Sequence, residues 1–305
     1  MQALEFHTLD VFTETVFGGN QLAVFPDAPE LPTAVMQAIA REFNLSETVF
    51  VRPTETPGAW RKLRIFTPGA ELPFAGHPTI GTAQLLVELG LAPAPDADGA
   101  TTFAFEEGVG LVPVEVTRPA SGKFFSWLTA ARQPESRGPA PARAILASLL
   151  GLAPDDILED ERDAPAAWSA GVPYLCVPVR DRAALARVNV DAARWRTALA
   201  DFWSKEIFAF CHEPEGTAAN VRARMFAPGL GIVEDPATGS AAAAFAGYLW
   251  QRQGGPGKWI IAQGLEMGRP STLHVEAAGA GGQLRTVRVG GSAVRVSQGT
   301  LQLPA

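Results

Sequence analysis

Cysteine is scarce in this chain, and so are long apolar runs. The 305 residues include two cysteines, Cys176 and Cys211, which lie in apolar stretches and lack the Cys-x-x-Cys spacing of many metal and redox sites. We expect both to be buried, reduced thiols. No apolar run approaches the roughly 18 residues that a membrane-spanning helix needs, which predicts a soluble protein.

Basic clusters are also missing. The formal net charge is −7, whereas nucleic-acid binding depends on neutralising phosphates with grouped basic side chains. We therefore expect small-molecule ligands, and neither nucleic acid nor membrane as a partner. The first five residues lack the basic and apolar regions of an export signal, so we expect a cytoplasmic protein. Because the chain has no Walker loop, no Gly-x-Gly-x-x-Gly after a strand and no metal-ligand spacing, we expect no cofactor and no metal.

Length and hydrophobic pattern predict two domains of the α+β class. A chain of 305 residues exceeds what one core usually serves. Apolar residues recur at helical spacing over residues 32–43, which predicts an amphipathic helix there. Short runs rich in β-branched and aromatic residues predict strands of a mostly antiparallel, strongly curved sheet at residues 9–12, 22–25, 48–51, 63–66, 102–105 and 111–116.

A six-residue pattern occurs twice. Arg64-Ile-Phe-Thr-Pro-Gly69 returns as Arg224-Met-Phe-Ala-Pro-Gly229, with Arg, Phe, Pro and Gly in the same order. Each copy precedes an acidic residue, a proline and then Gly-Thr-Ala (81–83) or Gly-Ser-Ala (239–241). We expect each triplet to open an apolar, buried helix, at residues 77–89 and 238–250. The duplication predicts two structurally equivalent halves.

The starts of these two helices are candidate anion sites. A helix leaves its first backbone N–H groups unpaired, and they attract negative charge. Two such starts facing one another would hold a carboxylate or an enolate-like oxyanion. The alternative is that Gly76, Gly81 and Gly239 only permit tight turns and close packing. The duplication favours the anion site.

Polar residues gather at the same helix starts, namely Glu71, His77, Thr79, Glu234, Asp235, Thr238 and Ser240. The two hydroxyls at 238 and 240 could equally be helix caps, and the acids at 234 and 235 could serve the helix dipole. We expect the histidine to carry a proton or donate to a ligand, with a purely structural histidine as the alternative.

Glu47 lies between the predicted helix at 32–43 and a β-branched strand, flanked by apolar residues. Partial desolvation raises the pKa of a carboxyl group toward the working pH, as a general acid/base requires. From the residues alone, an exposed glutamate in a turn is the simpler interpretation. A family resemblance decides between the two.

Several segments resemble the phenazine-biosynthesis isomerase family, known as PhzF-like. They occur in the family's order and span nearly the whole chain, at residues 10–13, 17–20, 45–47, 64–68, 71–78, 224–226, 234–241 and 263–270. Each segment is short, but the combination is specific for the family. This chain has Gly19-Asn20-Gln21 where the family commonly has Gly-Asn-Pro, and residues 124–134 and 164–173 match little.

The resemblance implies the diaminopimelate-epimerase fold. In that fold two pseudo-symmetric half-domains, each a curved, mostly antiparallel sheet or barrel around a central helix, face one another across the active site. It implies an N-terminal half-domain at residues 1–125, completed by 291–305, and a C-terminal half-domain at 126–290. A homodimer is expected.

The resemblance also implies the chemistry. The family's characterised enzyme isomerises trans-2,3-dihydro-3-hydroxyanthranilate without metal or organic cofactor, and its catalytic glutamate matches Glu47. We expect a cofactor-independent isomerase that shifts a proton at carbon of a small, cyclic, carboxylate-bearing metabolite. The expected catalytic residues are Glu47, His77 and Asp235, and the expected substrate-binding residues are Gly76, Thr238, Gly239 and Ser240.

Two other functions stay open. One is an amino-acid racemase or epimerase on the same scaffold, and the other is a non-catalytic ligand-binding or interaction protein. Epimerase relatives use a cysteine at each of the two helix ends. Neither end carries one here, so a two-thiol mechanism is disfavoured.

Overall fold

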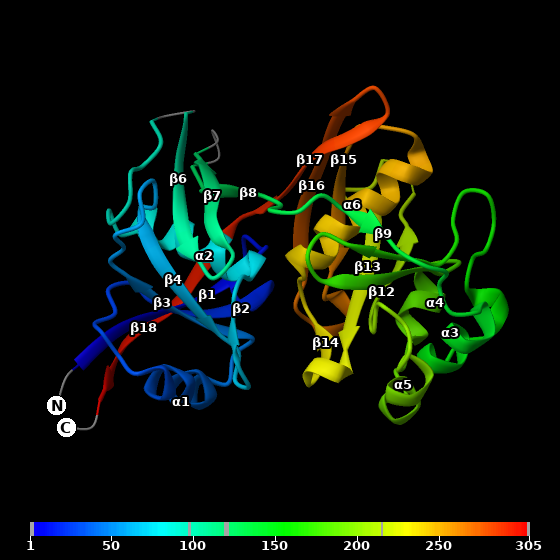
Figure 1. Ribbon diagram of the computed structural model, residues 1–305, viewed down its shortest axis with the longest axis horizontal. Coiled ribbons are helices and arrows are strands. Elements are labelled where there is room, and N and C mark those ends of the chain that lie inside the picture. The colour runs from blue at the N-terminus through cyan, green and yellow to red at the C-terminus, as the bar shows by residue number, and fades with distance from the viewer. Residues whose placement is uncertain (1–2, 97–98, 119–121, 215, 304–305) are drawn as a thin grey trace. The chain divides into compact units, whose positions relative to one another are not determined.

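The computed structural model describes residues 3–96, 99–118, 122–214 and 216–303. Residues 1 and 2, on which the prediction of no export signal partly rests, lie outside the described residues. The chain divides into two compact units (Figure 1). We call residues 1–129 with 290–305 the N-terminal unit, and residues 130–289 the C-terminal unit.

The N-terminal unit is a mixed sheet in the strand order β18-β1-β2-β3-β4-β6-β7-β8, with β5 paired to β4. The pairs β2–β3 and β4–β6 are parallel, and a helix crosses over between the strands of each pair, as parallel strands require. Its elements are β1 (Ala3–Val11), β2 (Asn20–Phe25), α1 (Thr33–Phe43), β3 (Glu47–Arg52), β4 (Arg61–Phe66), β5 (Glu71–Leu72), α2 (Gly76–Glu88), β6 (Ala100–Glu107), β7 (Gly110–Thr117), β8 (Phe125–Thr129) and β18 (Ala293–Gln302).

The two helices of this unit have different surroundings. α1 presents one apolar face, with Met36, Ile39 and Ala40 buried against a cluster that includes Phe25 and Phe50, as its amphipathic pattern predicts. α2 is buried along nearly its whole length and contacts β1, β2, β3, β7, β8 and β18. The sheet therefore curves around α2. The last strand of the chain, β18, completes this unit by pairing antiparallel with β1, from Ala3 opposite Gln302 to Val11 opposite Ala293 (Figure 1).

The C-terminal unit repeats this topology. Its strands pair in the order β9-β10-β11-β12-β13-β15-β16, with β14 paired to β13, and β11–β12 and β13–β15 are the parallel pairs. Its elements are β9 (Glu135–Ser136), α3 (Arg143–Leu150), a 3₁₀ turn (Pro154–Asp156), β10 (Ala166–Ser169), β11 (Pro173–Pro178), α4 (Arg182–Arg187), α5 (Ala192–Ala198), β12 (Glu206–His212), β13 (Val221–Ala227), a 3₁₀ turn (Pro228–Leu230), β14 (Ile232–Asp235), α6 (Gly239–Gln253), β15 (Gly257–Gln263), a 3₁₀ turn (Leu265–Met267), β16 (Ser271–Ala280) and β17 (Gln283–Gly291).

Strand β12 shows why this sheet is apolar on both faces. Ile207, Ala209 and Cys211 pack in a core with residues of α3, α4 and α5. Phe208 and Phe210, which alternate with them, contact Phe245 of α6. A strand covered by helices on both sides reads as a continuous apolar run, as this one does. Both cysteines are free and buried, so that prediction is confirmed.

The topological match confirms the predicted α+β class with two equivalent halves. α2 and α6 are the equivalent central helices, each following a β4–β5 or β13–β14 hairpin. One detail of the prediction is wrong. α2 begins at Gly76, so the triplet 81–83 lies inside the helix and does not open it. A Cβ on Gly81 would lie 2.6 Å from a methyl of Val11 and 2.7 Å from one of Leu22, so this glycine permits close packing of helix and sheet.

Candidate active site

Glu47 and His77 come together in the N-terminal unit. Glu47 is the first residue of β3 and His77 is the second of α2, and Glu47 Oε2 lies 3.1 Å from His77 Nε2. Their side chains are 12% and 7% exposed, so the exposed turn glutamate is not what the structure contains. A carboxyl and an imidazole this close and this dry can share or exchange a proton.

The imidazole of His77 is held as a neutral ring. Burial lowers its pKa to about 3, although a hydrogen bond to the backbone of Gln21 opposes the shift. Since Nε2 faces Glu47, the nitrogen that donates to the Gln21 carbonyl is Nδ1. A neutral ring that donates through Nδ1 presents a bare Nε2 to the Glu47 carboxyl.

The start of α2 is a candidate anion site. Its N-cap residue is Ala75, whose side chain makes no capping hydrogen bond. Gly76 and His77 thus bring backbone N–H groups to the positive end of a buried helix whose first turn holds no acidic residue.

In the C-terminal unit, Asp235 and Thr238 form a buried network with Gln263. The Thr238 hydroxyl donates to Asp235 Oδ2 at 2.5 Å, instead of accepting from the first turn of α6 as a cap would. Gln263, the last residue of β15, donates to the Asp235 carbonyl at 2.8 Å and to the Thr238 hydroxyl at 3.1 Å. The network fixes the side chain of Asp235 beside the start of α6.

The first residues of α6 are Gly239 and Ser240. Ser240 Oγ lies 2.7 Å from the hydroxyl of Tyr174 on β11. Ser240 is the second residue of α6, as His77 is of α2, so the two occupy equivalent helix positions. The candidate residues therefore form two sets, one at each helix start: Glu47, Gly76 and His77, and Asp235, Thr238, Gly239 and Ser240.

Glu71 and Glu234, which we grouped with the polar residues of the helix starts, belong to the scaffold. Arg64 donates to both oxygens of Glu71, at 2.7 and 2.6 Å, and Arg224 to both oxygens of Glu234, at 2.8 and 2.7 Å. Bidentate pairs of this kind fix geometry. They tie each repeated arginine to the hairpin that precedes its helix.

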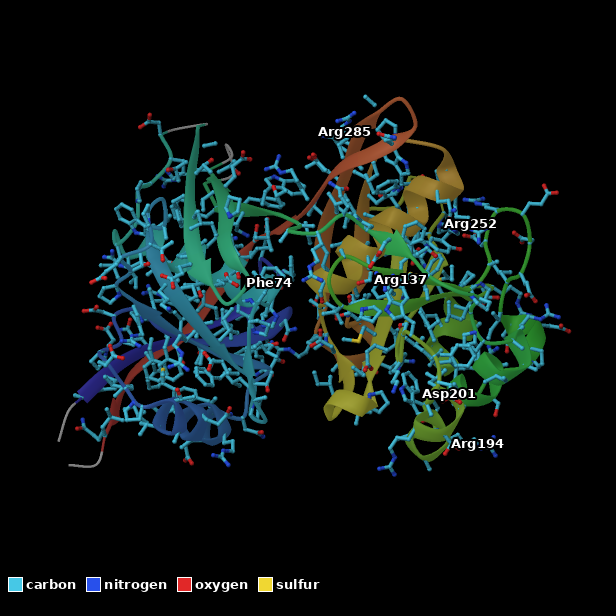
Figure 2. All side chains as sticks on the ribbon, in the orientation of Figure 1. Phe74, Arg137, Arg194, Asp201, Arg252 and Arg285 are labelled. Carbon is cyan, nitrogen blue, oxygen red and sulfur yellow. The ribbon has the colours of Figure 1, made fainter. Side chains whose placement is uncertain are left out.

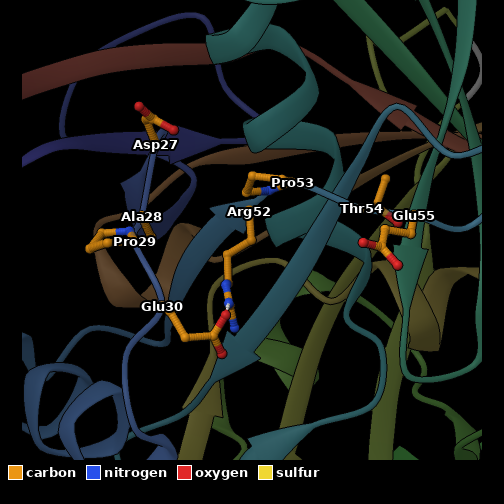
Figure 3. A pocket seen from close by; sticks show the side chains of 8 residues that line it. All are labelled: Asp27, Ala28, Pro29, Glu30, Arg52, Pro53, Thr54 and Glu55. Carbon is orange, nitrogen blue, oxygen red and sulfur yellow. Dashed lines mark hydrogen bonds and ion pairs between the residues drawn. The ribbon is translucent and has the colours of Figure 1, made fainter.

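A surface pocket of about 460 Å³ lies at the other end of β3, away from Glu47 (Figure 3). Arg52, the last residue of the strand, pairs there with Glu30. Five residue steps along a strand separate Glu47 from Arg52, on the order of 16 Å. None of the candidate site residues is among the eight that line this pocket: Asp27, Ala28, Pro29, Glu30, Arg52, Pro53, Thr54 and Glu55.

Sequence reasoning missed three buried polar residues at the helix starts. Gln263 and Tyr174 contact candidate site residues, and Glu107 bonds to Thr79 in the first turn of α2. Gln263 lies in a segment that carried the family resemblance, which was a usable signal. The burial of Glu107 depends on a hairpin that folds onto the helix, and no local pattern marks it.

Among the described residues, none of the helices is long and apolar enough to cross a membrane. Within the same part of the chain, no group of three or more His, Cys, Asp or Glu side chains is arranged to hold a metal ion.

Comparison with known proteins identifies the class. A crystal structure of a Bacillus anthracis phenazine biosynthesis protein of the PhzF family matches with a TM-score of 0.88 at 24% identity, over 99% of this chain and 100% of that one. A probable proline racemase from Agrobacterium radiobacter matches with a TM-score of 0.63 at 12% identity, over 99% of this chain and 93% of that one. These two likenesses show that the chain has the fold shared by PhzF-family proteins and proline racemase-like proteins.

The family follows from the sequence comparisons. The family model described as phenazine biosynthesis-like protein matches residues 9–299, and the chain belongs to this family. An uncharacterized isomerase from Mesorhizobium japonicum is 43% identical over 99% of both chains. The trans-2,3-dihydro-3-hydroxyanthranilate isomerase of Pseudomonas aeruginosa is 36% identical over 97% of this chain and 98% of the relative. The predicted family and the predicted enzyme class are confirmed.

Proposed function

We propose that this PhzF-like isomerase shifts a proton between carbon atoms of a small, cyclic, carboxylate-bearing metabolite, without a cofactor, and that Glu47 is its general acid/base. The observation that carries the proposal is the buried approach of Glu47 Oε2 to His77 Nε2 at 3.1 Å. The name of the Pseudomonas aeruginosa relative supports the substrate class.

The neutral imidazole gives the pair a defined proton balance. After Glu47 Oε2 has taken a proton from the substrate, the carboxyl group donates a hydrogen bond to the bare Nε2 of His77, so the contact is favourable. While Glu47 is ionised, two hydrogen-bond acceptors face each other, and this unfavourable contact favours uptake of a proton from the substrate by Glu47. His77 thereby stabilises the protonated intermediate state of Glu47 and orients its carboxyl, and Glu47 returns the proton to the neighbouring carbon.

The remaining candidate residues are assigned to binding. The N–H groups at Gly76 and Gly239 and the Ser240 hydroxyl would receive the substrate's carboxylate or developing oxyanion, since each helix start attracts negative charge. Thr238 would hold the carboxylate of Asp235, and Asp235 would accept hydrogen bonds from the substrate's donor groups. Asp235→Asn is accordingly expected to weaken substrate binding as well as turnover. We expect the same of His77→Asn, because His77 would also hydrogen-bond the substrate's polar groups.

We further propose a cytoplasmic location and a homodimer. Sedimentation equilibrium of the purified chain tests the oligomeric state, and a monomer across the working concentration range would contradict it.

The experiment is proton exchange in deuterated water. Trans-2,3-dihydro-3-hydroxyanthranilate is offered first, followed by other small carboxylates, and deuterium uptake and products are analysed by mass spectrometry and NMR. An isomerase incorporates deuterium and yields a double-bond isomer, and a racemase incorporates it and yields only the epimer. Binding without exchange across the panel would contradict an enzymatic role for the site.

A further inference from the structure

Glu107 ends β6 with its side chain buried, 5% exposed, at the first turn of α2. Its neighbour Glu106 lies on the opposite face of the strand, where Lys62 pairs with it at 2.6 Å. Glu107 instead meets Thr79, with Oε1 at 2.7 Å from the hydroxyl oxygen. Thr79 is fully buried, so this is a dry contact between two polar groups.

The hydrogens around Thr79 can be counted. Its hydroxyl oxygen lies 2.7 Å from the carbonyl oxygen of Ala75 and 2.7 Å from Glu107 Oε1. A hydroxyl carries one hydrogen and a carbonyl carries none, so Thr79 donates to only one of the two. Both contacts are hydrogen bonds only if Thr79 donates to Ala75 and Glu107, as a carboxylic acid, donates to Thr79.

The C-terminal unit has a glutamine, which is always neutral, at the position equivalent to Glu107. Gln263 ends β15 as Glu107 ends β6, and β15 and β6 are the strands that follow the two central helices. Gln263 donates to the Thr238 hydroxyl at 3.1 Å, and that hydroxyl donates onward to Asp235. The threonines differ in position, since Thr238 is the N-cap of α6 and Thr79 lies within the first turn of α2.

The residues that follow these two side chains also match. Gly108 comes after Glu107, and a Cβ there would lie 2.8 Å from Cα of Pro73. Gly264 comes after Gln263, and a Cβ there would lie 2.6 Å from the carbonyl oxygen of Pro236. Pro73 and Pro236 precede the helices by the same three residues, and the labelled Phe74 in Figure 2 marks the segment that enters α2. In each unit, the residues at the end of β6 or β15 therefore pack closely against the proline that lies three residues before the central helix.

We propose that Glu107 is a positioning residue that acts as a neutral carboxylic acid, donating through Thr79 to Ala75 and so fixing Gly76 and His77 beside Glu47. The effect of Glu107 on turnover rests on the proposed acid/base role of Glu47. The hydrogen bond from Glu107 to Thr79 is independent of that role.

The electrostatic surroundings agree with a neutral Glu107. Burial raises the pKa of Glu107 to about 8; Thr79 could donate to the carboxylate once it is ionised, and this opposes the shift only in part. Charged or titratable side chains on the elements packed around it are Arg61, Lys62 and Arg64 of β4, Glu71 of β5, Glu115 of β7, and His77 and Glu88 of α2. Lys62 and Arg64 are occupied by Glu106 and Glu71, and Glu88 by Arg295.

Substitutions at two positions test the proposal. Glu107→Gln gives the N-terminal unit the side chain of its counterpart, whose amide N–H donates without ionising. We expect it to keep kcat at pH 7 and to remove a loss of kcat that the native enzyme shows as the pH rises through about 8. Thr79→Val breaks the relay and Thr79→Ser retains it, so valine should lower kcat more than it changes KM. The loss should reach about tenfold to a hundredfold, since misplacing reacting groups by about 1 Å can cost on the order of 100-fold.

A spectroscopic measurement tests the protonation of Glu107 independently of the proposed isomerase function. The infrared carbonyl band of a protonated carboxylic acid should appear in the native protein at pH 6 to 7, persist in Glu47→Gln and lose intensity in Glu107→Gln. Burial also raises the pKa of Glu206, to about 7, so the band of that acid should remain in Glu107→Gln. Loss of band intensity in Glu107→Gln without isomerase activity in the native protein would overturn the proposed function and leave the hydrogen-bond assignment standing. Equal band intensity in the native protein and Glu107→Gln, or a Glu107→Gln enzyme as impaired as Thr79→Val, would overturn the positioning role.

Discussion

The two units use one topology for different chemistry. The arginines of the repeated hexapeptide are used in the same way in both units. Arg64 and Arg224 each pair with a glutamate of the next strand. Each guanidinium also lies over the ring of the phenylalanine two residues later, 5.2 and 4.9 Å from the ring centroid. The second residue of the central helix shows the difference, since it is a histidine beside a carboxyl in one unit and a serine beside a tyrosine in the other. Duplication thus preserved the scaffold, while the groups at the helix starts diverged.

The arginines also differ in depth, which gives the largest expected effect. Arg224 is 8% exposed and donates to the carbonyls of Leu185 and Val188 besides Glu234. The side chain of Arg64 is 17% exposed; it pairs with a carboxylate that is 36% exposed and reaches the hydroxyl of Thr33. Removing one partner of a buried ion pair leaves a charge without compensation.

Arg224→Ala should therefore lower the free energy of unfolding by about 3–5 kcal/mol. Arg64→Ala is the matched control and should cost about 1 kcal/mol, as partly exposed pairs do. Denaturant unfolding of both variants measures the difference. Equal losses would mean that the two copies of the motif carry equal weight.

The pH dependence of stability sharpens the contrast at the helix starts. The folded-state pKa of Glu107 is raised from the ordinary 4.5 to about 8, so the folded protein holds a proton that the unfolded chain has released. This contribution is complete below pH 4.5 and is lost as the pH rises toward 8. It makes the free energy of unfolding fall by up to about 1.4 kcal/mol per pH unit, and Glu107→Gln should remove that slope.

His77 has the opposite sign. Burial lowers its pKa from 6.5 to about 3, so its contribution to stability is complete above pH 6.5 and is lost as the pH falls toward 3. Unfolding titrations of native protein, Glu107→Gln and His77→Asn across this range check both directions. Parallel pH profiles for the native protein and either variant would contradict the corresponding assignment.

Helix packing gives the smallest effect. A Cβ on Gly81 of α2 would meet methyl groups of Val11 and Leu22, whereas one on Gly247 of α6 would lie 2.5 Å from the ring of Pro134 and 2.6 Å from that of Trp168. Methyl groups can turn aside and rings cannot. We expect Gly247→Ala to destabilise by about 1–3 kcal/mol and Gly81→Ala by less, since alanine also favours the helix by about 1 kcal/mol. Thermal unfolding of the two variants decides, and a larger loss at Gly81 would refute the argument.

The sequence predicted features that depend on local pattern. The helix at 32–43 appears as α1 at Thr33–Phe43, because its apolar spacing marks one buried face. Five of the six predicted strands lie within β2, β3, β4, β6 and β7, and the sixth, predicted at 9–12, overlaps the end of β1 and runs one residue beyond it. The duplicated hexapeptide pointed to the shared topology of the units. The start of α2 was misjudged because Gly81 looks like a helix-opening glycine, whereas close contact with the sheet explains it.

Features that depend on tertiary contacts escaped prediction. Glu106 and Glu107 are the same residue type in consecutive positions, and only the fold makes one an ion-pair partner and the other a buried acid. α4 and α5 are six and seven residues long, too short for a clear helical period, and they acquire their partners in the core from distant strands. Glu47 and His77 were proposed separately, and their 3.1 Å approach follows from the positions of β3 and α2 in the sheet.

The central claim is that Glu47 carries the proton, and Glu47→Gln tests it most directly. The amide keeps the size and most hydrogen-bonding capacity of the side chain but cannot exchange a proton with carbon. On the substrate found by the exchange screen, we predict that deuterium incorporation and turnover fall together by at least a hundredfold to ten-thousandfold, with ligand affinity and thermal unfolding nearly unchanged. A folded Glu47→Gln enzyme with near-native exchange would contradict the account and make His77 the leading proton carrier.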